Sequence, residues 1–209
     1  ISFWSNPGSP TGKTCIHNFL VPGTFTVTST ITGAETVVIG GGGGGGTNVG
    51  GGGGAGAYRH ASGVTLPATG YPVTVGTGGQ TIFGSLPGTP NQGSKGWYGG
   101  DSSFNGVTSN GGGGGGGAWA AQTGGTSGPY ASPGNASGGG GAGVNPTGPG
   151  PSGTYGNPGG TGANGSPYTA GGGGGAGGTG ASASNPSGGN GGAGVQLPAM
   201  FRDPAQQGD

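Results

Sequence analysis

The sequence VVIGGGGGGGTNVGGGGGAG, residues 37–56, holds glycine runs of seven and five residues, and a second run of seven fills residues 111–117. Glycine accounts for 67 of the 209 residues. A glycine run has no side chain to bury or to react with, but each residue offers an N–H and a C=O with no Cβ in front of them. These runs therefore predict an architecture before they predict a function.

The rest of the composition excludes an ordinary globular domain. Leu, Ile, Val and Phe make up about an eighth of the chain, which is too little for a large apolar core. Only 4% of the residues are charged and the formal net charge is zero, so the chain also lacks the self-repulsion of a typical disordered protein. The few basic residues are scattered and form no patch for nucleic acid. The sequence has no run of about 20 apolar residues, so it predicts no membrane span.

The sequence pattern excludes two other classes of glycine-rich protein. Collagen needs glycine at every third position, whereas here glycine comes in blocks and residues 24–32 have none. Flexible linkers do not usually carry tryptophan and tyrosine at the ends of their glycine runs.

The chain divides into two predicted parts. Residues 1–39 form a docking segment and a β-hairpin, because β-branched residues alternate with polar ones over 24–32 and a returning strand follows Gly33 at 35–39. Residues 40–209 form the glycine-rich domain, with further short β-hairpins at about 71–83 and 103–108. Almost no α-helix is expected.

Glycine runs placed side by side can form polyglycine-II helices, which have the polyproline-II geometry of three residues per turn and outward-facing backbone groups. Without Cβ atoms, neighbouring helices can approach and hydrogen-bond on all sides. The predicted fold is irregular and mainly β, with N-terminal β-hairpins followed by a polyglycine-II sandwich with long end loops. The alanines near run ends, at positions 55, 142, 176 and 193, would point their methyl groups outward. Its scaffold glycines are Gly40, Gly43, Gly46, Gly52, Gly111, Gly114, Gly117, Gly140 and Gly173. Its loops are expected at about 57–70, 84–105, 118–137, 144–170 and 179–187.

Short strand-and-turn sequences lie between the glycine blocks, at residues 17–28, 35–39, 70–79, 103–110 and 192–204. They resemble the glycine-rich domain of phage tail-fibre and virion structural proteins, of the marine phage or cyanophage type. The resemblance implies a polyglycine-II sandwich like that of the distal adhesins of T-even-like phages, whose variable loops touch a bacterial receptor. It also implies location in a virion as an extracellular fibre.

The sequence predicts no enzyme, cofactor or metal site. Residues 8–14 end like a phosphate loop, but three residues rather than four separate its first glycine from the Gly-Lys pair. His17, His60 and the single Cys15 have no metal-ligand spacing, and the acidic residues form no carboxylate pair suited to acid–base catalysis.

The aromatic residues of the expected loops are the candidates for receptor contact: Trp97, Tyr98, Trp119, Tyr130, Tyr155 and Tyr168. They either cover the ends of glycine runs or stack on sugars and anchor a partner. The favoured function is a phage tail-fibre or adhesin domain that binds a host surface protein or glycan and contacts other virion subunits, including copies of itself.

Two alternatives stay open. The first is a structural filament or coat protein whose glycine lattice mediates subunit assembly. The second, more distant, is an ice-binding protein, because alternate threonines over residues 24–32 would share one strand face about 6.6–6.8 Å apart.

Overall fold

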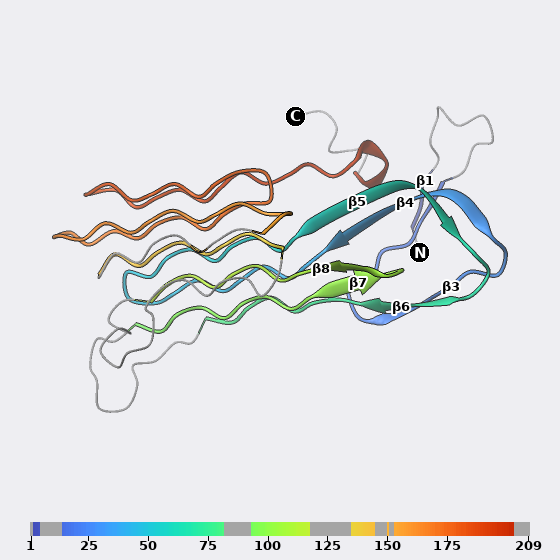
Figure 1. Cartoon of the computed structure of the whole chain (residues 1–209), viewed down its shortest axis with the longest axis horizontal. Helices are drawn as coiled ribbons and strands as arrows, with labels where there is room; N and C mark the ends of the chain where they lie inside the picture. The colour runs from blue at the N-terminus through green and yellow to red at the C-terminus, as the bar shows by residue number, and fades with distance from the viewer. Residues whose placement is uncertain are drawn as a thin grey trace.

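A computed structural model describes residues 2–4, 14–81, 93–117, 135–144, 150 and 153–202 of the chain. The molecule is elongated (Figure 1). Its β-strands gather at one end, and extended glycine-rich segments run side by side from them to the opposite end.

The described residues are mainly β, with antiparallel sheets and almost no helix, which confirms the prediction of a mainly β fold with almost no α-helix. β1 pairs with β2, β4 pairs with β5, and a four-stranded sheet has the order β3-β6-β7-β8. A short 3-10 helix, η2, is the single helical element of the part described. The elements are β1 (Ser2–Trp4), β2 (Thr14–Ile16), β3 (Gly23–Thr26), β4 (Ile31–Ile39), β5 (Tyr58–Leu66), β6 (Gly70–Thr74), β7 (Ser102–Phe104), β8 (Val107–Ser109) and η2 (Ala199–Phe201).

The predicted pairing of residues 24–32 with residues 35–39 is wrong. β4 runs without a turn through Gly33 and pairs with β5, which lies in a stretch predicted as loop, while β3 pairs with β6. Gly33 and Gly63 have φ values of 72° and 69° and lie where the β4–β5 register shifts. Glycine at positive φ therefore marks bulges in a long strand pair here, not a chain reversal.

The expected hairpin at 71–83 also has a different partner. β6 pairs with β3 and β7, Thr81 is outside any strand, and residues 82 and 83 lie outside the described residues. Near 103–108, where a short hairpin was expected, β7 and β8 pair across Asn105 and Gly106. Both turn residues have positive φ, 46° and 76°, as a two-residue type I′ hairpin requires.

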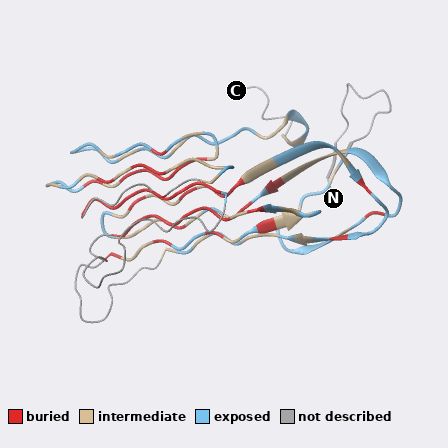
Figure 2. Cartoon of the chain, viewed as in Figure 1, coloured by how far each residue is buried: buried red, intermediate tan, exposed pale blue. Residues whose placement is uncertain are grey.

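A small apolar core joins these strands at the sheet end of the molecule. Val27, Leu66 and Tyr71 are buried, and partly buried aromatic rings pack around them. The Phe104 ring lies 5.7 Å from that of Tyr71 and 6.1 Å from that of Phe25. The Tyr71 hydroxyl donates to a backbone oxygen 3.0 Å away. This core is too small to cover the rest of the chain, and Figure 2 shows that most of the other buried residues lie along the central glycine-rich segments.

The glycine-rich segments, called lattice segments below, continue the strand registers. Beyond the last β4–β5 pair, Ile39 opposite Tyr58, the hydrogen bonds run from Gly40 to Ala57, from Gly43 to Gly54 and from Gly46 to Gly51 in the same register. The β6–β7 register continues from Gly100 to Thr77 and from Trp97 to Gln80, and the β7–β8 register continues from Gly99 to Gly112 and from Gly96 to Gly115. The lattice segments are residues 40–47, 51–57, 77–81, 94–100, 110–117, 135–143, 157–163, 169–175, 177–183 and 188–194.

Candidate functional site

Hydrogen bonding in the lattice repeats every three residues. The run at 40–46 shows this clearly: its N–H groups point in turn to different neighbours, and the C=O groups of Gly41 and Gly44 accept from the segment at 110–117. Among the described residues, Gly42 and Gly45 donate to no acceptor. Gly40, Gly43 and Gly46 donate to segment 51–57, and Gly41, Gly44 and Thr47 donate to segment 94–100.

The space available for side chains follows the same three-residue period. A Cβ on Gly40, Gly43 or Gly46 would come within 3.0 Å of backbone atoms in the segment at 110–117, a distance that real Cβ atoms essentially never show. On Gly42 and Gly45 the nearest atoms would be 3.8 Å and 3.7 Å away, which is ordinary van der Waals contact. Only every third position of this run can therefore carry a side chain.

The glycines predicted as scaffold lie in lattice segments. A Cβ on any of them would meet backbone atoms of a neighbouring segment closer than 3.0 Å. These positions require glycine because the backbone of a neighbouring segment occupies the place that a Cβ would take. This set is Gly40, Gly43, Gly46, Gly52, Gly111, Gly114, Gly117, Gly140 and Gly173.

Several stretches predicted as loops contain lattice segments or strands instead. Residues 57–70 are largely β5. The stretches 84–105 and 144–170 contain lattice segments 94–100 and 157–163, and the stretch 179–187 contains most of segment 177–183. These segments are poor in consecutive glycines because they lie on the outside of the lattice, where some side chains can point to solvent. The described part of 118–137 begins at residue 135 and joins the segment at 135–143.

The outward orientation predicted for four alanines is wrong for Ala142. Ala55 and Ala176 are half-buried and Ala193 is exposed, but Ala142 is completely buried. Its segment lies in the middle of the lattice, with hydrogen bonds to segments on several sides, so no solvent face is available there.

The four aromatic candidates that the structure describes do not gather into one site. Trp97 and Tyr98 are about half exposed but belong to a lattice segment and not to a loop. The backbone N–H of Trp97 donates to Gln80, and its C=O accepts from Gly44. Trp119 and Tyr130 lie outside the described residues.

The two remaining aromatic candidates lie at opposite ends of the molecule. Tyr155 occupies a turn near the sheets, where the guanidinium of Arg59 in β5 lies 4.7 Å from the centre of its ring. Arg59 also donates to the C=O of Thr108 at 3.2 Å. Tyr168 is 43% exposed in a loop at the far end of the lattice. Of the two, only Tyr168 is placed for contact at the end away from the sheets.

Three described loops, called the tip loops below, close the lattice at the end opposite the sheets: residues 47–50, 164–168 and 184–187 (Figure 1). The side chain of Asn185 joins two of them. Its amide nitrogen donates to the C=O groups of Asn164 and Gly165 at 3.4 Å and 3.3 Å, and its amide oxygen accepts from the Thr169 hydroxyl at 2.7 Å. These loops are therefore fixed relative to each other by side chains as well as by the lattice.

The tip loop at residues 47–50 has an unusual backbone conformation. Asn48 and Val49 have φ values of 53° and 59°. The left-handed region is uncommon for any residue with a Cβ and is a true outlier for a β-branched one such as valine. The C=O of Val49 accepts from the N–H of Gly143, and the Val49 side chain stays partly exposed. Backbone strain of this kind concentrates at functional sites.

Reactive chemistry is sparse in the part of the chain that the structure describes. No group of three His, Cys, Asp or Glu residues there could hold a metal ion. His60 lies 2.6 Å from Glu35 across the β4–β5 pair, both partly exposed, and Cys15 is exposed. Nor does the described chain contain a helix with the length and apolar character needed to cross a membrane.

The threonine row considered for ice binding is interrupted. β3 ends at Thr26, and residues 28 and 29 form a bend before β4 begins at Ile31. The threonines of residues 24–32 thus do not share one flat strand.

Comparison with known proteins gives one match. A family model described as a glycine-rich domain matches residues 19–208, which is nearly the whole chain. No curated protein and no solved structure matches the chain.

Proposed function

Since the chain belongs to the glycine-rich domain family, we propose that it is a structural domain of a phage tail fibre or adhesin, whose tip loops recognise a host cell-surface receptor. In this proposal the lattice is the scaffold and the tip loops are the recognition surface. The protein would be located in a virion, as part of an extracellular fibre, and other fibre subunits would attach at its sheet end.

The scaffold part of the proposal assigns the lattice segments as polyglycine-II helices. The support is the three-residue period, which appears both in the hydrogen bonds of residues 40–46 and in the space around their Cβ positions. A β-strand would repeat every two residues, whereas the polyproline-II geometry repeats every three. Closely packed threefold helices form a stiff support because each helix is hydrogen-bonded to several others.

The observation that carries the recognition part is the arrangement of the tip loops. They come from segments far apart in the chain, yet the lattice and the Asn185 side chain hold them at one end. They display the partly exposed side chains of Val49 and Tyr168, and Val49 has a strained backbone. Binding residues are commonly found on loops that a rigid scaffold positions.

A second candidate function, a filament or coat protein, is favoured by the opposite end. Leu20 and Val21 are 79% and 69% exposed beside the strands, an apolar pair typical of subunit contacts. In this case the lattice would serve assembly alone, and the tip loops would bind no receptor.

The test compares Tyr168→Ala at the tip with Tyr155→Ala at the sheet end. Purified protein is applied to a panel of bacterial cells, and bound protein is measured by fluorescence. We expect Tyr168→Ala to lower cell binding about tenfold or more, as the loss of an interface anchor does, with the thermal unfolding midpoint unchanged. Tyr155→Ala should leave binding intact.

Two results would count against this function. If Tyr155→Ala and Tyr168→Ala lower binding equally, the tip loops are not the recognition surface. If the wild-type protein binds no cell surface but self-associates until Leu20 and Val21 are replaced by serine, the filament function replaces the adhesin function.

A further inference from the structure

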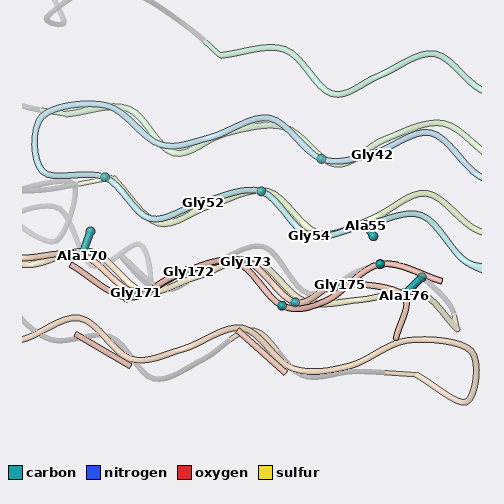
Figure 3. Close-up of a pocket in the computed structure, with 18 residues that line it drawn as sticks. Gly42, Gly52, Gly54, Ala55, Ala170, Gly171, Gly172, Gly173, Gly175 and Ala176 are labelled. Carbon is teal, nitrogen blue, oxygen red and sulfur yellow. The ribbon is translucent and has the colours of Figure 1, made fainter. Parts of the chain in front are cut away.

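A groove of about 660 Å³ runs along one side of the lattice (Figure 3). Its walls come from four lattice segments: 40–47, 51–57, 169–175 and 188–194. Almost all lining residues are glycines, and the others are alanines, among them Ala170 and Ala176, which stand three residues on either side of Gly173. The groove therefore presents backbone and methyl groups but no charged or bulky side chain.

The lattice hydrogen-bond pattern is incomplete at this groove. Gly172 donates to Ala181 and Gly174 donates to Gly138, so the N–H groups of the segment at 169–175 bond to neighbours on two sides. Gly173, between them, is buried, yet its N–H has no acceptor among the described residues. An unpaired backbone donor in a buried residue is rare in folded proteins.

The adjacent wall, segment 51–57, which is bonded directly to segment 169–175, also has unpaired groups. Gly52 donates to Gly171 and Gly54 donates to Gly113, whereas neither the N–H nor the C=O of Gly53 is bonded within the described chain. At the groove edges, Gly42 and Gly191 also lack an acceptor for their N–H groups in the part that the structure describes. Each of these glycines lines the groove and is the third-position residue whose neighbours in sequence are bonded into the lattice.

Free space for side chains coincides with these unpaired groups. A Cβ on Gly191 would stand 3.9 Å from the nearest atom, the C=O oxygen of Gly173, and a Cβ on Gly42 would stand 3.8 Å from that of Gly54. One residue further along each segment, on Gly192 or Gly43, a Cβ would come within 3.0 Å of backbone atoms. The open positions thus face a place in the lattice that no described segment fills.

We propose that the groove is a binding site for an extended glycine-rich peptide segment of a partner chain, which occupies this place as one more lattice segment. The partner's backbone accepts from the N–H of Gly173 and donates to the C=O of Gly53. Because the walls are backbone, the ligand must lack side chains wherever it faces them, as the protein's own segments do. Six residue steps from Ala170 to Ala176 correspond to roughly 19 Å of such a helix, so about seven ligand residues fit the groove.

The test uses a peptide of seven glycines with two lysines at each end for solubility, and a control peptide with seven alanines between the same lysines. Amide exchange is followed by NMR on the full chain labelled with 15N-glycine. We expect the glycine peptide to slow exchange at Gly173 about tenfold or more, because the amide gains an acceptor, and the alanine peptide to have no effect.

Two matched variants locate the site. Gly191→Leu fills the groove from an open position, and Gly78→Leu places the same side chain at another open position, also 3.9 Å from the nearest atom but outside the groove. We expect Gly191→Leu to weaken peptide binding at least about tenfold and Gly78→Leu to leave it unchanged, with both variants unfolding at the wild-type temperature.

The proposal is overturned if the glycine peptide leaves Gly173 exchange unaltered at millimolar concentration, if the alanine peptide binds equally well, or if both leucine variants bind alike. Sedimentation equilibrium of the full chain identifies the partner: a dimer that Gly191→Leu abolishes would make a second copy the source of the segment. None of these outcomes depends on whether the tip loops bind a cell surface.

Discussion

Replacing Gly43 with alanine should destabilise the protein strongly, whereas the same change at the adjacent Gly42 should not. At Gly43 the added Cβ would come within 3.0 Å of the backbone of Gly112 and Gly113 in a neighbouring segment. At Gly42 it would stand 3.8 Å from the closest atom. Both residues belong to one uninterrupted run of glycines, so the difference arises from the lattice and not from local sequence.

The expected difference can be worked from the contacts. To admit the Gly43 methyl, segments 40–47 and 110–117 must separate, which weakens the two bonds between them, from Gly112 to Gly41 at 2.8 Å and from Gly115 to Gly44 at 2.9 Å. Two net hydrogen bonds contribute about 1–3 kcal/mol to stability, and forcing a methyl group into a packed site costs about 1–3 kcal/mol. At Gly42, alanine lowers the entropy of the unfolded chain and stabilises the fold by about 0.4–1 kcal/mol.

Urea denaturation followed by circular dichroism measures both free energies of unfolding. We expect the variants to differ by about 3 kcal/mol or more, and their melting temperatures by about 6–12 °C for a chain of this size. If Gly43→Ala and Gly42→Ala agree to within about 0.5 kcal/mol, which is the ordinary effect of a surface substitution, the three-residue lattice is refuted.

Two further substitutions probe the sheet end. Ser109 is completely buried and its hydroxyl donates to a β4 backbone oxygen at 2.7 Å, so Ser109→Ala should cost about 0.5–1.5 kcal/mol in urea denaturation by removing this buried hydrogen bond. The exposed Ser184→Ala is the control, and equal effects would contradict the assignment. Gly106 has open space around its Cβ position but a φ of +76°, so Gly106→Ala should lower stability by about 1–2 kcal/mol in a thermal melt, and a stabilisation like that expected for Gly42→Ala would contradict it.

The sequence was sufficient to predict the mainly β class and the scarcity of α-helix in the described residues, because glycine strongly disfavours the α-helix. It could not predict strand partners. The alternation at residues 24–32 favours a strand, but the nearest apolar partner in space lies beyond two glycine segments, in β5 and β6. Local alternation shows which residues can form strands. Which strands pair with each other is determined by the packing of the lattice segments that connect them.

The candidate site was harder to predict for a related reason. Trp97 and Tyr98 were expected in a loop because they lie between the long glycine runs and not within one. In the fold their segment lies at the outside of the lattice, where only the inward positions need glycine. An outer segment is bonded to the lattice on one side and exposed on the other. No residue type marks such a segment, so lattice segments rich in Pro, Asn and Ser cannot be told from loops by sequence.

The glycine lattice has no side chains with which to specify its own register. In a sheet, register is fixed by which side chains face the core, and a run of identical glycines offers no such distinction between one alignment and the next. Here the adjoining strands supply it: three antiparallel pairs, β4–β5, β6–β7 and β7–β8, continue into lattice segments without a change of register. The small aromatic core around Tyr71 and Phe104 therefore does more than its size indicates, since it fixes side-chain contacts that align hydrogen bonds far beyond it. Because slippage of any one pair would misplace the tip loops at the opposite end, the ability of those loops to form a surface depends on a core at the other end of the molecule.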